Sequence, residues 1–133
     1  MHKPFLITAC IFAAIAVILG AFGAHGLKQI VPPETITTFE TGIRYHFYHA
    51  FALLATGMLY ERGRRGWIKF AGISFIAGIV LFSGSLYLLT IFKATETVGL
   101  NKLGIITPFG GLFLIAGWIA LAIALSLSPW RTA

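Results

Sequence analysis

The chain has 133 residues, of which 58% are hydrophobic and 11% charged, and its mean hydropathy is +0.89. A soluble domain of this length cannot bury so much apolar surface, because a small domain keeps a large share of its surface in water. These numbers argue against a soluble protein and indicate one domain in a lipid bilayer. The formal net charge is +6. Its basic residues lie between apolar runs, as membrane topology requires, so we do not expect nucleic acid as a partner.

The first predicted transmembrane helix covers residues 4–27. Its apolar part, Pro4 to Phe22, is close to the roughly 20 residues that a helix needs to cross hydrocarbon. The alternative is a cleaved signal peptide with Lys3 as its basic N-terminal region, but the apolar run is long for one. Cys10 lies in this run and is the only cysteine, which excludes an internal disulfide. Small residues share one helix face, where another backbone can approach closely: Ala9, Ala13, Ala16, Gly20 and Gly23.

A polar link, residues 28–32, precedes the second predicted helix. Pro33 suits a first helical turn, and apolar residues then recur at helical spacing. The pattern predicts an amphipathic start outside the membrane, followed by a span over residues 42–60. Glu40 and Arg44 are four residues apart in the favourable order for an ion pair, so we expect them to pair.

A basic link, residues 62–66, leads to the third predicted span over residues 67–92, and the fourth covers residues 105–128. We interpret Pro108 as part of a helix start rather than of a broken helix that binds substrate, as in some transporters. Small residues recur at every fourth position of the fourth helix, which predicts a packing surface for a second copy of the chain. They are Ala116, Ala120, Ala124 and Ser128.

These elements predict an all-α fold, an integral membrane four-helix bundle with both termini on one side of the membrane. That side would carry Lys3, Arg62, Arg64, Arg65, Lys69 and Arg131. The other side would carry Lys28, Arg44, Lys93 and Lys102. Because basic residues concentrate in cytoplasmic loops, we expect both termini to be cytoplasmic.

Four segments, in order along nearly the whole chain, resemble the motifs of a family of small membrane proteins, the YgdD/YwdK-like domain of unknown function 423. They are residues 20–27 (GAFGAHGL), 44–50 (RYHFYHA), 81–89 (LFSGSLYLL) and 104–111 (GIITPFGG). The resemblance implies a multi-pass protein of the bacterial inner membrane, with a related eukaryotic membrane protein, and it implies no activity. The family pattern contains His25, Arg44, Tyr45, Tyr48 and His49. It often has glutamine where this chain has His46, which argues against a mechanism that needs His46.

Polar residues gather in the predicted outer half of the bundle, where each needs a partner or a wet cavity because charge is costly in lipid. As candidate binding residues we select His25, Arg44, His46, Tyr48, His49 and Ser85. At helical spacing His46 and His49 share a face with Gly42, whereas Arg44 and Tyr48 point away from it.

The two histidines have three interpretations. They could hold a metal or haem together with His25, because imidazole suits zinc, copper and iron. They could relay protons or bind a solute, because histidine titrates near neutral pH. We favour the third, hydrogen bonds to neighbouring helices. No carboxylate is placed inside the bundle to complete a metal site, so we expect no metal and no cofactor.

Catalysis is not expected, because the chain has no aspartate and its glutamates lie at helix ends or in loops. They are Glu34, Glu40, Glu61 and Glu96. The sequence therefore favours a non-enzymatic structural or accessory membrane protein that forms a homo-oligomer. The alternative is a small-solute, ion or proton permease with its site in the outer half of the bundle.

Overall fold

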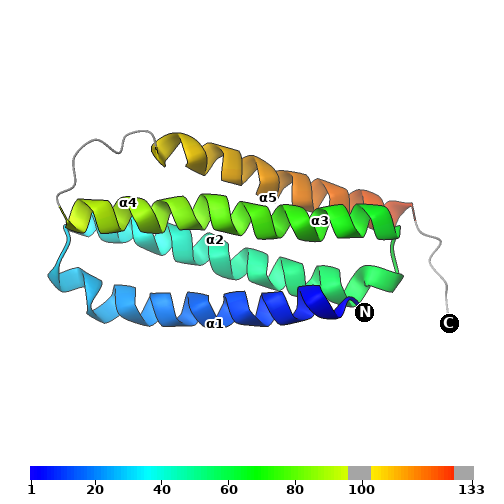
Figure 1. The fold of residues 1–133 in the computed structure, drawn as a ribbon, viewed down its shortest axis with the longest axis horizontal. Coiled ribbons are helices and arrows are strands. Elements are labelled where there is room, and N and C mark those ends of the chain that lie inside the picture. The colour runs from blue at the N-terminus through cyan, green and yellow to red at the C-terminus, as the bar shows by residue number, and fades with distance from the viewer. Residues whose placement is uncertain (96–102, 128–133) are drawn as a thin grey trace.

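The computed structural model describes residues 1–95 and 103–127, and these residues form helices and no strand. The predicted all-α four-helix bundle is confirmed (Figure 1). The third helix is one long rod made of α3, a π-helical segment and α4. The elements are α1 (Lys3–His25), η1 (Leu27–Gln29), α2 (Pro33–Met58), η2 (Leu59–Glu61), α3 (Arg65–Gly78), η3 (Ile79–Ser83), α4 (Gly84–Ala94) and α5 (Leu103–Ser126).

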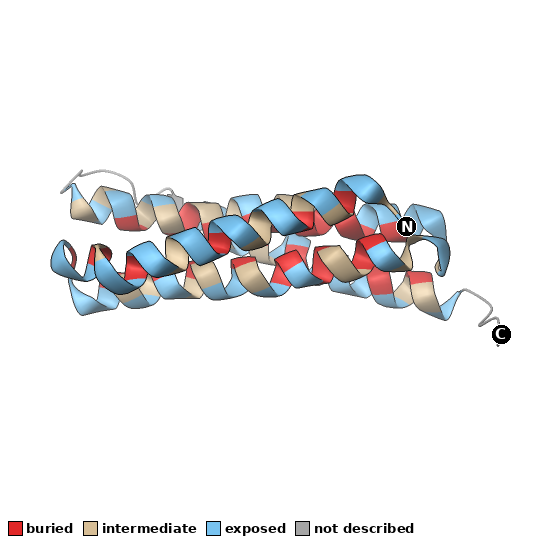
Figure 2. Cartoon of the chain, turned by 90° about the horizontal axis from the view of Figure 1, so that it is seen from below, coloured by how far each residue is buried: buried red, intermediate tan, exposed pale blue. Residues whose placement is uncertain are grey.

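Successive helices run in opposite directions, so the N-terminus and the end of α5 lie at the same end of the bundle (Figure 1). Each helix packs mainly on its neighbours in the chain: α1 on α2, α2 on the α3–α4 rod, and that rod on α5. Exposed residues follow the outer faces along the whole length (Figure 2). Many of them are large and apolar, such as Ile18, Phe109 and Leu112, which suits contact with lipid.

Three helical stretches within residues 1–95 and 103–127 are long and apolar enough to cross a membrane. They are Lys3–Gln29, Arg65–Ala94 and Gly104–Ser126. The helix α2 is not among them, because it carries Arg44 and two histidines. It nevertheless connects the far end of α1 to the start of α3 at the opposite end of the bundle. A span within α2, over residues 42–60, therefore stays a prediction that this connection supports.

The small residues of α1 pack inside the bundle, as predicted. A Cβ atom placed on Gly23 would lie 2.9 Å from the Phe39 ring, and one placed on Gly57 of α2 would lie 2.7 Å from the Leu6 side chain. Glycine at these positions lets α1 and α2 approach closely. These contacts also define the register of the two helices, that is, which residue of α2 lies beside which residue of α1.

The small-residue stripe of α5 does not face a second copy, so this prediction was wrong. Ala120 and Ala124 are buried within the chain, and the backbone N–H of Arg64 donates to the Ala124 carbonyl at 3.1 Å. The stripe therefore serves the packing of α5 on α3. Helical spacing alone cannot tell an inner packing face from an outer one, because both need small residues. Ser128 lies outside the described residues.

Pro108 lies inside α5, because the helix already begins at Leu103. The prediction that Pro108 marks the helix start was therefore wrong. Pro108 cannot donate to the carbonyl of Gly104, but Gly104 is exposed in the first turn, so the helix tolerates the missing bond.

The π-helix η3 was not predicted, and α5 lies directly on it. A Cβ atom on Gly110 of α5 would lie 2.7 Å from the Phe82 Cα, which is backbone and cannot rotate away. Only glycine allows this approach of two backbones. The contact places η3 against both α2 and α5, at the level of the polar residues described next.

Candidate functional site

His46 and His49 lie on the inner face of α2, with exposed fractions of 4% and 6%. Gly42 and Leu53 are buried on the same face, whereas Arg44 and Tyr48 are exposed, as helical spacing predicts. The contacts of Gly57 with Leu6 and of Gly20 with Ile43 place His49 beside the middle of α1. His49 therefore lies near the middle of the bundle, and His46 lies about one turn nearer the end that holds His25.

Both ring nitrogens of His49 are bonded to protein groups. Nδ1–H donates to the Tyr45 carbonyl at 2.7 Å, and the Trp118 indole N–H donates to Nε2 at 3.2 Å. A carbonyl only accepts and an indole only donates, so the ring is neutral with its proton on Nδ1. The second bond ties α2 to α5.

Trp118 was missed by the sequence analysis. It differs from Trp67, which lies in the first turn of α3, because it stands in the middle of α5. An indole N–H far from the ends of a transmembrane helix needs an acceptor from another helix. That position is the signal that could have identified it.

His46 has one bonded ring nitrogen and one without a partner. Its Nδ1 lies 3.1 Å from the Tyr87 hydroxyl of α4, and the Phe12 ring of α1 packs edge-on at 5.5 Å between ring centroids. Its Nε2 is buried and has no hydrogen-bond partner among the described residues. Among the described residues the Tyr87 hydroxyl proton has no other acceptor, so Tyr87 donates to Nδ1 and the His46 proton is on Nε2.

Ser85 is buried and ties α4 to α5. Its hydroxyl donates to the Phe82 carbonyl at 2.8 Å, and the Thr107 hydroxyl, 2.6 Å away, donates to Ser85 in turn. The neighbouring Ser83 hydroxyl is also buried but, within the described part of the chain, has no partner.

The other predicted site residues lie on the surface. His25 is exposed, and its ring contacts the Ala21 carbonyl of its own helix at 3.1 Å. The structure therefore does not bring His25 to the two buried histidines. Among residues 1–95 and 103–127, no group of three or more His, Cys, Asp or Glu side chains could hold a metal ion.

The predicted ion pair of Glu40 with Arg44 does not form. The one ion pair of the described residues joins the Met1 amino group to Glu61 at 2.8 Å. Glu40 and Arg44 are both exposed, and an exposed pair gains little for ordering two long side chains. Arg44 lies at the level of Gly20, about five residues or 8 Å from the end of α1 at His25, so its side chain can reach a headgroup from there.

The segments singled out in the sequence meet in one region. His46 of residues 44–50 bonds Tyr87 of residues 81–89, and Ser85 bonds Thr107 of residues 104–111. Gly110 lies on the backbone of Phe82. The shared motifs therefore build the contact of α2, the π-helix and α5.

The family model described as "Protein of unknown function (DUF423)" matches residues 19–111. The chain belongs to this family. It is 42% identical to the UPF0382 membrane protein YwdK of Bacillus subtilis, over 92% of this chain and 95% of that protein. It is 36% identical to a UPF0382 membrane protein of Haemophilus influenzae, over 92% and 93% of the two chains.

Membership of this family confirms the predicted resemblance, and the chain is a membrane protein. It is also 35% identical to the UPF0382 inner membrane protein YgdD of Escherichia coli, over 85% of this chain and 82% of that protein. No solved structure matches the fold. The names of these relatives give a location and no reaction or ligand, so a function has to be argued from the geometry.

Proposed function

We propose that the protein is a non-enzymatic structural or accessory component of the membrane, and that its buried polar side chains hold its helices together. The bonding of His49 carries this proposal. Both of its nitrogens are used, Nδ1 by the Tyr45 carbonyl of its own helix and Nε2 by Trp118 of α5, so a metal or solute could bind there only by displacing one of these bonds. The pair of Ser85 with Thr107 joins α4 to α5 in the same way.

The position of the carboxylates supports a protein without catalysis. Glu34, Glu40 and Glu61 are all exposed, whereas both histidines are buried. An acid–base mechanism inside the described bundle would rest on histidine and tyrosine alone. His49 lacks a free nitrogen for it.

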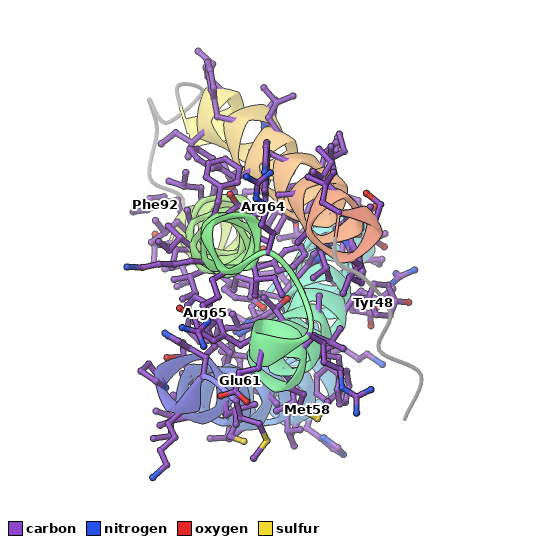
Figure 3. The ribbon with its side chains drawn as sticks, turned by 90° about the vertical axis from the view of Figure 1, so that its right-hand side faces the viewer. Tyr48, Met58, Glu61, Arg64, Arg65 and Phe92 are labelled. Atoms are coloured by element: carbon purple, nitrogen blue, oxygen red, sulfur yellow. The ribbon has the colours of Figure 1, made fainter. Side chains whose placement is uncertain are left out.

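We place the protein in the cytoplasmic, or inner, membrane as a multi-pass protein with cytoplasmic termini. Arg64 and Arg65 lie at the end of the bundle that holds the N-terminus (Figure 3). Trp67 follows in the first turn of α3, and a shallow surface hollow is lined there by Arg64, Gly66, Trp67 and Phe70. Basic and indole groups at one end are typical of the cytoplasmic interface.

Homo-oligomerisation remains part of the proposal, but its support has changed. Two residues of the stripe that motivated it, Ala120 and Ala124, are buried within one chain. The outer faces of α1 and α5 instead carry large apolar side chains, including Ile18, Leu112 and Ile119, which could contact lipid or another copy. Cross-linking in native membranes distinguishes the two, because a monomer at every expression level contradicts an oligomer.

A second candidate function, a proton or small-solute permease, is favoured by one specific observation. The Nε2 atom of His46 and the hydroxyl of Ser83 are buried and lack partners among the described residues. Unpaired polar groups at membrane depth mark transport paths in other proteins.

Proton flux into proteoliposomes separates the two functions. Vesicles loaded with a pH-sensitive dye are driven by a potassium diffusion potential. The structural role predicts the same proton leak as in protein-free vesicles. A larger flux that His46→Phe abolishes would contradict the proposal and favour the permease. Cys10→Ala is the matched control, because Cys10 is exposed on α1 and must leave any true flux unchanged.

A further inference from the structure

His46 and Ser83 lie in the same layer of the bundle. A Cβ atom on Gly42 would meet the side chains of Tyr87 and Leu86, so Gly42 of α2 lies beside residues 86 and 87 of α4. The two helices are antiparallel (Figure 1), so one turn onward on α2, at His46, corresponds to one turn back along the α3–α4 rod, at Ser83 in η3. The packing of Tyr45 on Phe82, at 4.7 Å between ring centroids, confirms this register.

The Tyr87 side chain places His46 at this level by an independent route. Aromatic side chains on a helix point toward its N-terminus, so the Tyr87 hydroxyl lies over the preceding turn, at Ser83. That hydroxyl is 3.1 Å from His46 Nδ1. The imidazole therefore lies beside the turn that carries Ser83, and Ser83 shares the helix face of Tyr87.

Ser83 differs from the other buried hydroxyl groups because of the π-helix. Thr56 and Thr90 each donate to the carbonyl four residues earlier, at 2.7 and 3.0 Å. Such bonds are the usual way to satisfy a hydroxyl inside a helix. Ser83 ends the π-helical segment, in which the backbone bonds are shifted by one residue, and its hydroxyl makes no such bond.

We propose that a bound water molecule bridges His46 Nε2 and the Ser83 hydroxyl. The His46 Nε2–H would donate to this water, and the water would donate to Ser83. Buried polar groups in proteins are nearly always bonded, and an internal water usually serves those that protein groups do not reach. In lipid no bulk solvent can replace it. The result is a hydrogen-bonded chain from Ser83 through water and His46 to Tyr87, held at the π-helix.

Water-edited solid-state NMR on protein with ¹⁵N-labelled histidine, in lipid vesicles, tests this site. Magnetisation passes from water protons to nitrogen atoms that contact bound water. We expect rapid transfer to His46 and at least a several-fold slower transfer to His49, whose nitrogens are both bonded to protein. His49 is thus a control within the same sample. Equally slow transfer to both rings overturns the proposal.

Ser83→Val removes the hydroxyl and fills the space, so transfer to His46 should fall to the His49 level. Ser83→Ala, a milder change, should reduce it in part. Unchanged transfer to His46 in both variants overturns the bridge. An unchanged His49 signal shows that the bundle is intact, because that signal depends on Trp118. Ser126→Val, at an exposed hydroxyl on α5, is the matched control and should change neither ring.

Discussion

The two buried histidines are three residues apart on α2, yet their ring nitrogens have different partners. His49 meets a carbonyl at Nδ1 and an indole N–H at Nε2. His46 meets a phenol at Nδ1. Because the partner decides where the proton of a neutral imidazole lies, one structure holds two opposite tautomers.

We predict that His49 carries its proton on Nδ1 and His46 on Nε2. Protonated and bare imidazole nitrogens differ by tens of ppm in ¹⁵N chemical shift, so a spectrum of the labelled protein at neutral pH distinguishes the tautomers. Tyr87→Phe should alter the His46 shifts and leave those of His49 in place. The same tautomer in both rings would contradict this assignment.

Glu61 is the second residue with a testable property, and it lies beyond the predicted span. The Met1 amino group bonds it, and this bond and charge, with a smaller effect of Arg65, hold the pKa of Glu61 below its usual range. The folded state therefore keeps this carboxylate ionised at lower pH than the unfolded state. The stabilisation is present above the ordinary glutamate pKa and is lost as the pH falls through the lowered value.

We predict a small acid-dependent loss of stability from this pair, because both partners are largely exposed. Glu61→Gln should reduce the change in melting temperature between neutral pH and pH 4. Above neutral pH the dependence of the melting temperature on pH should stay the same. Thermal unfolding in detergent micelles across this range measures it. If the melting temperature of the variant falls at acid pH as much as that of the unchanged protein, the loss of stability comes from other groups.

At the scale of the elements, glycines determine how closely α5 packs on its neighbours. It lies on the π-helix through Gly110, whose missing Cβ leaves room for the Phe82 backbone. At Gly78 of α3 the close neighbour is Leu114 of α5, and at Gly117 of α5 it is the ring of Phe75. The contact of α5 with the α3–α4 rod is thus specified by glycines on both helices.

Gly110→Ala should destabilise the bundle by about 3 kcal/mol, the upper end of the cost of overpacking, because backbone atoms cannot move aside. Gly111→Ala is the matched control. Its Cβ would lie 3.7 Å from the Phe82 ring, an ordinary contact, so we expect a change within about 0.5 kcal/mol. Unfolding in mixed detergent and denaturant micelles gives both values. Equal stability of the two variants would contradict the close approach.

For the whole molecule, the direction of the four helices predicts the topology. If α2 crosses the membrane, its two ends lie on opposite sides. Gln29 in η1 is then on the outer side of the membrane and Arg62 on the cytoplasmic side. Single cysteines at these positions, in a Cys10→Ala background, can be labelled with an impermeant maleimide. We expect Gln29→Cys to react in intact cells and Arg62→Cys to react only after permeabilisation. Reaction of both in intact cells would show that α2 does not cross.

Much of the fold could be predicted because lipid imposes simple patterns. Long apolar runs and small-residue faces predicted α1, α5 and the α3–α4 rod, and the alternation of faces on α2 placed His46 and His49 inside. The π-helix could not be predicted, since residues 79–83 are apolar apart from Ser83 and continue the pattern of the long apolar helix. The prediction that the α5 stripe packs on a second copy was wrong for a related reason. The sequence does not show which helix faces are buried within one chain.

The site was predicted only in part. The buried histidines and Ser85 were identified from their residue types, but grouping them with His25 and Arg44 rested on equal depth along the membrane. The depth of a residue does not show in which direction around the helix axis its side chain points. The side chains of His25 and Arg44 point away from the bundle interior and are exposed. The partners Trp118 and Tyr87 come from other helices, and only the packing of the whole bundle brings them to the histidines.

A double-mutant cycle on His49 and Trp118 tests most directly whether the buried polar groups hold the helices together. Trp118→Phe removes the N–H but keeps a ring, and His49→Phe removes the acceptor. Each single variant should lose stability, and the cycle should give a coupling of about 0.5–1.5 kcal/mol in lipid. The same cycle with Trp67→Phe, on α3, should give none. Zero coupling between His49 and Trp118 would contradict the account and leave His49 available for a ligand.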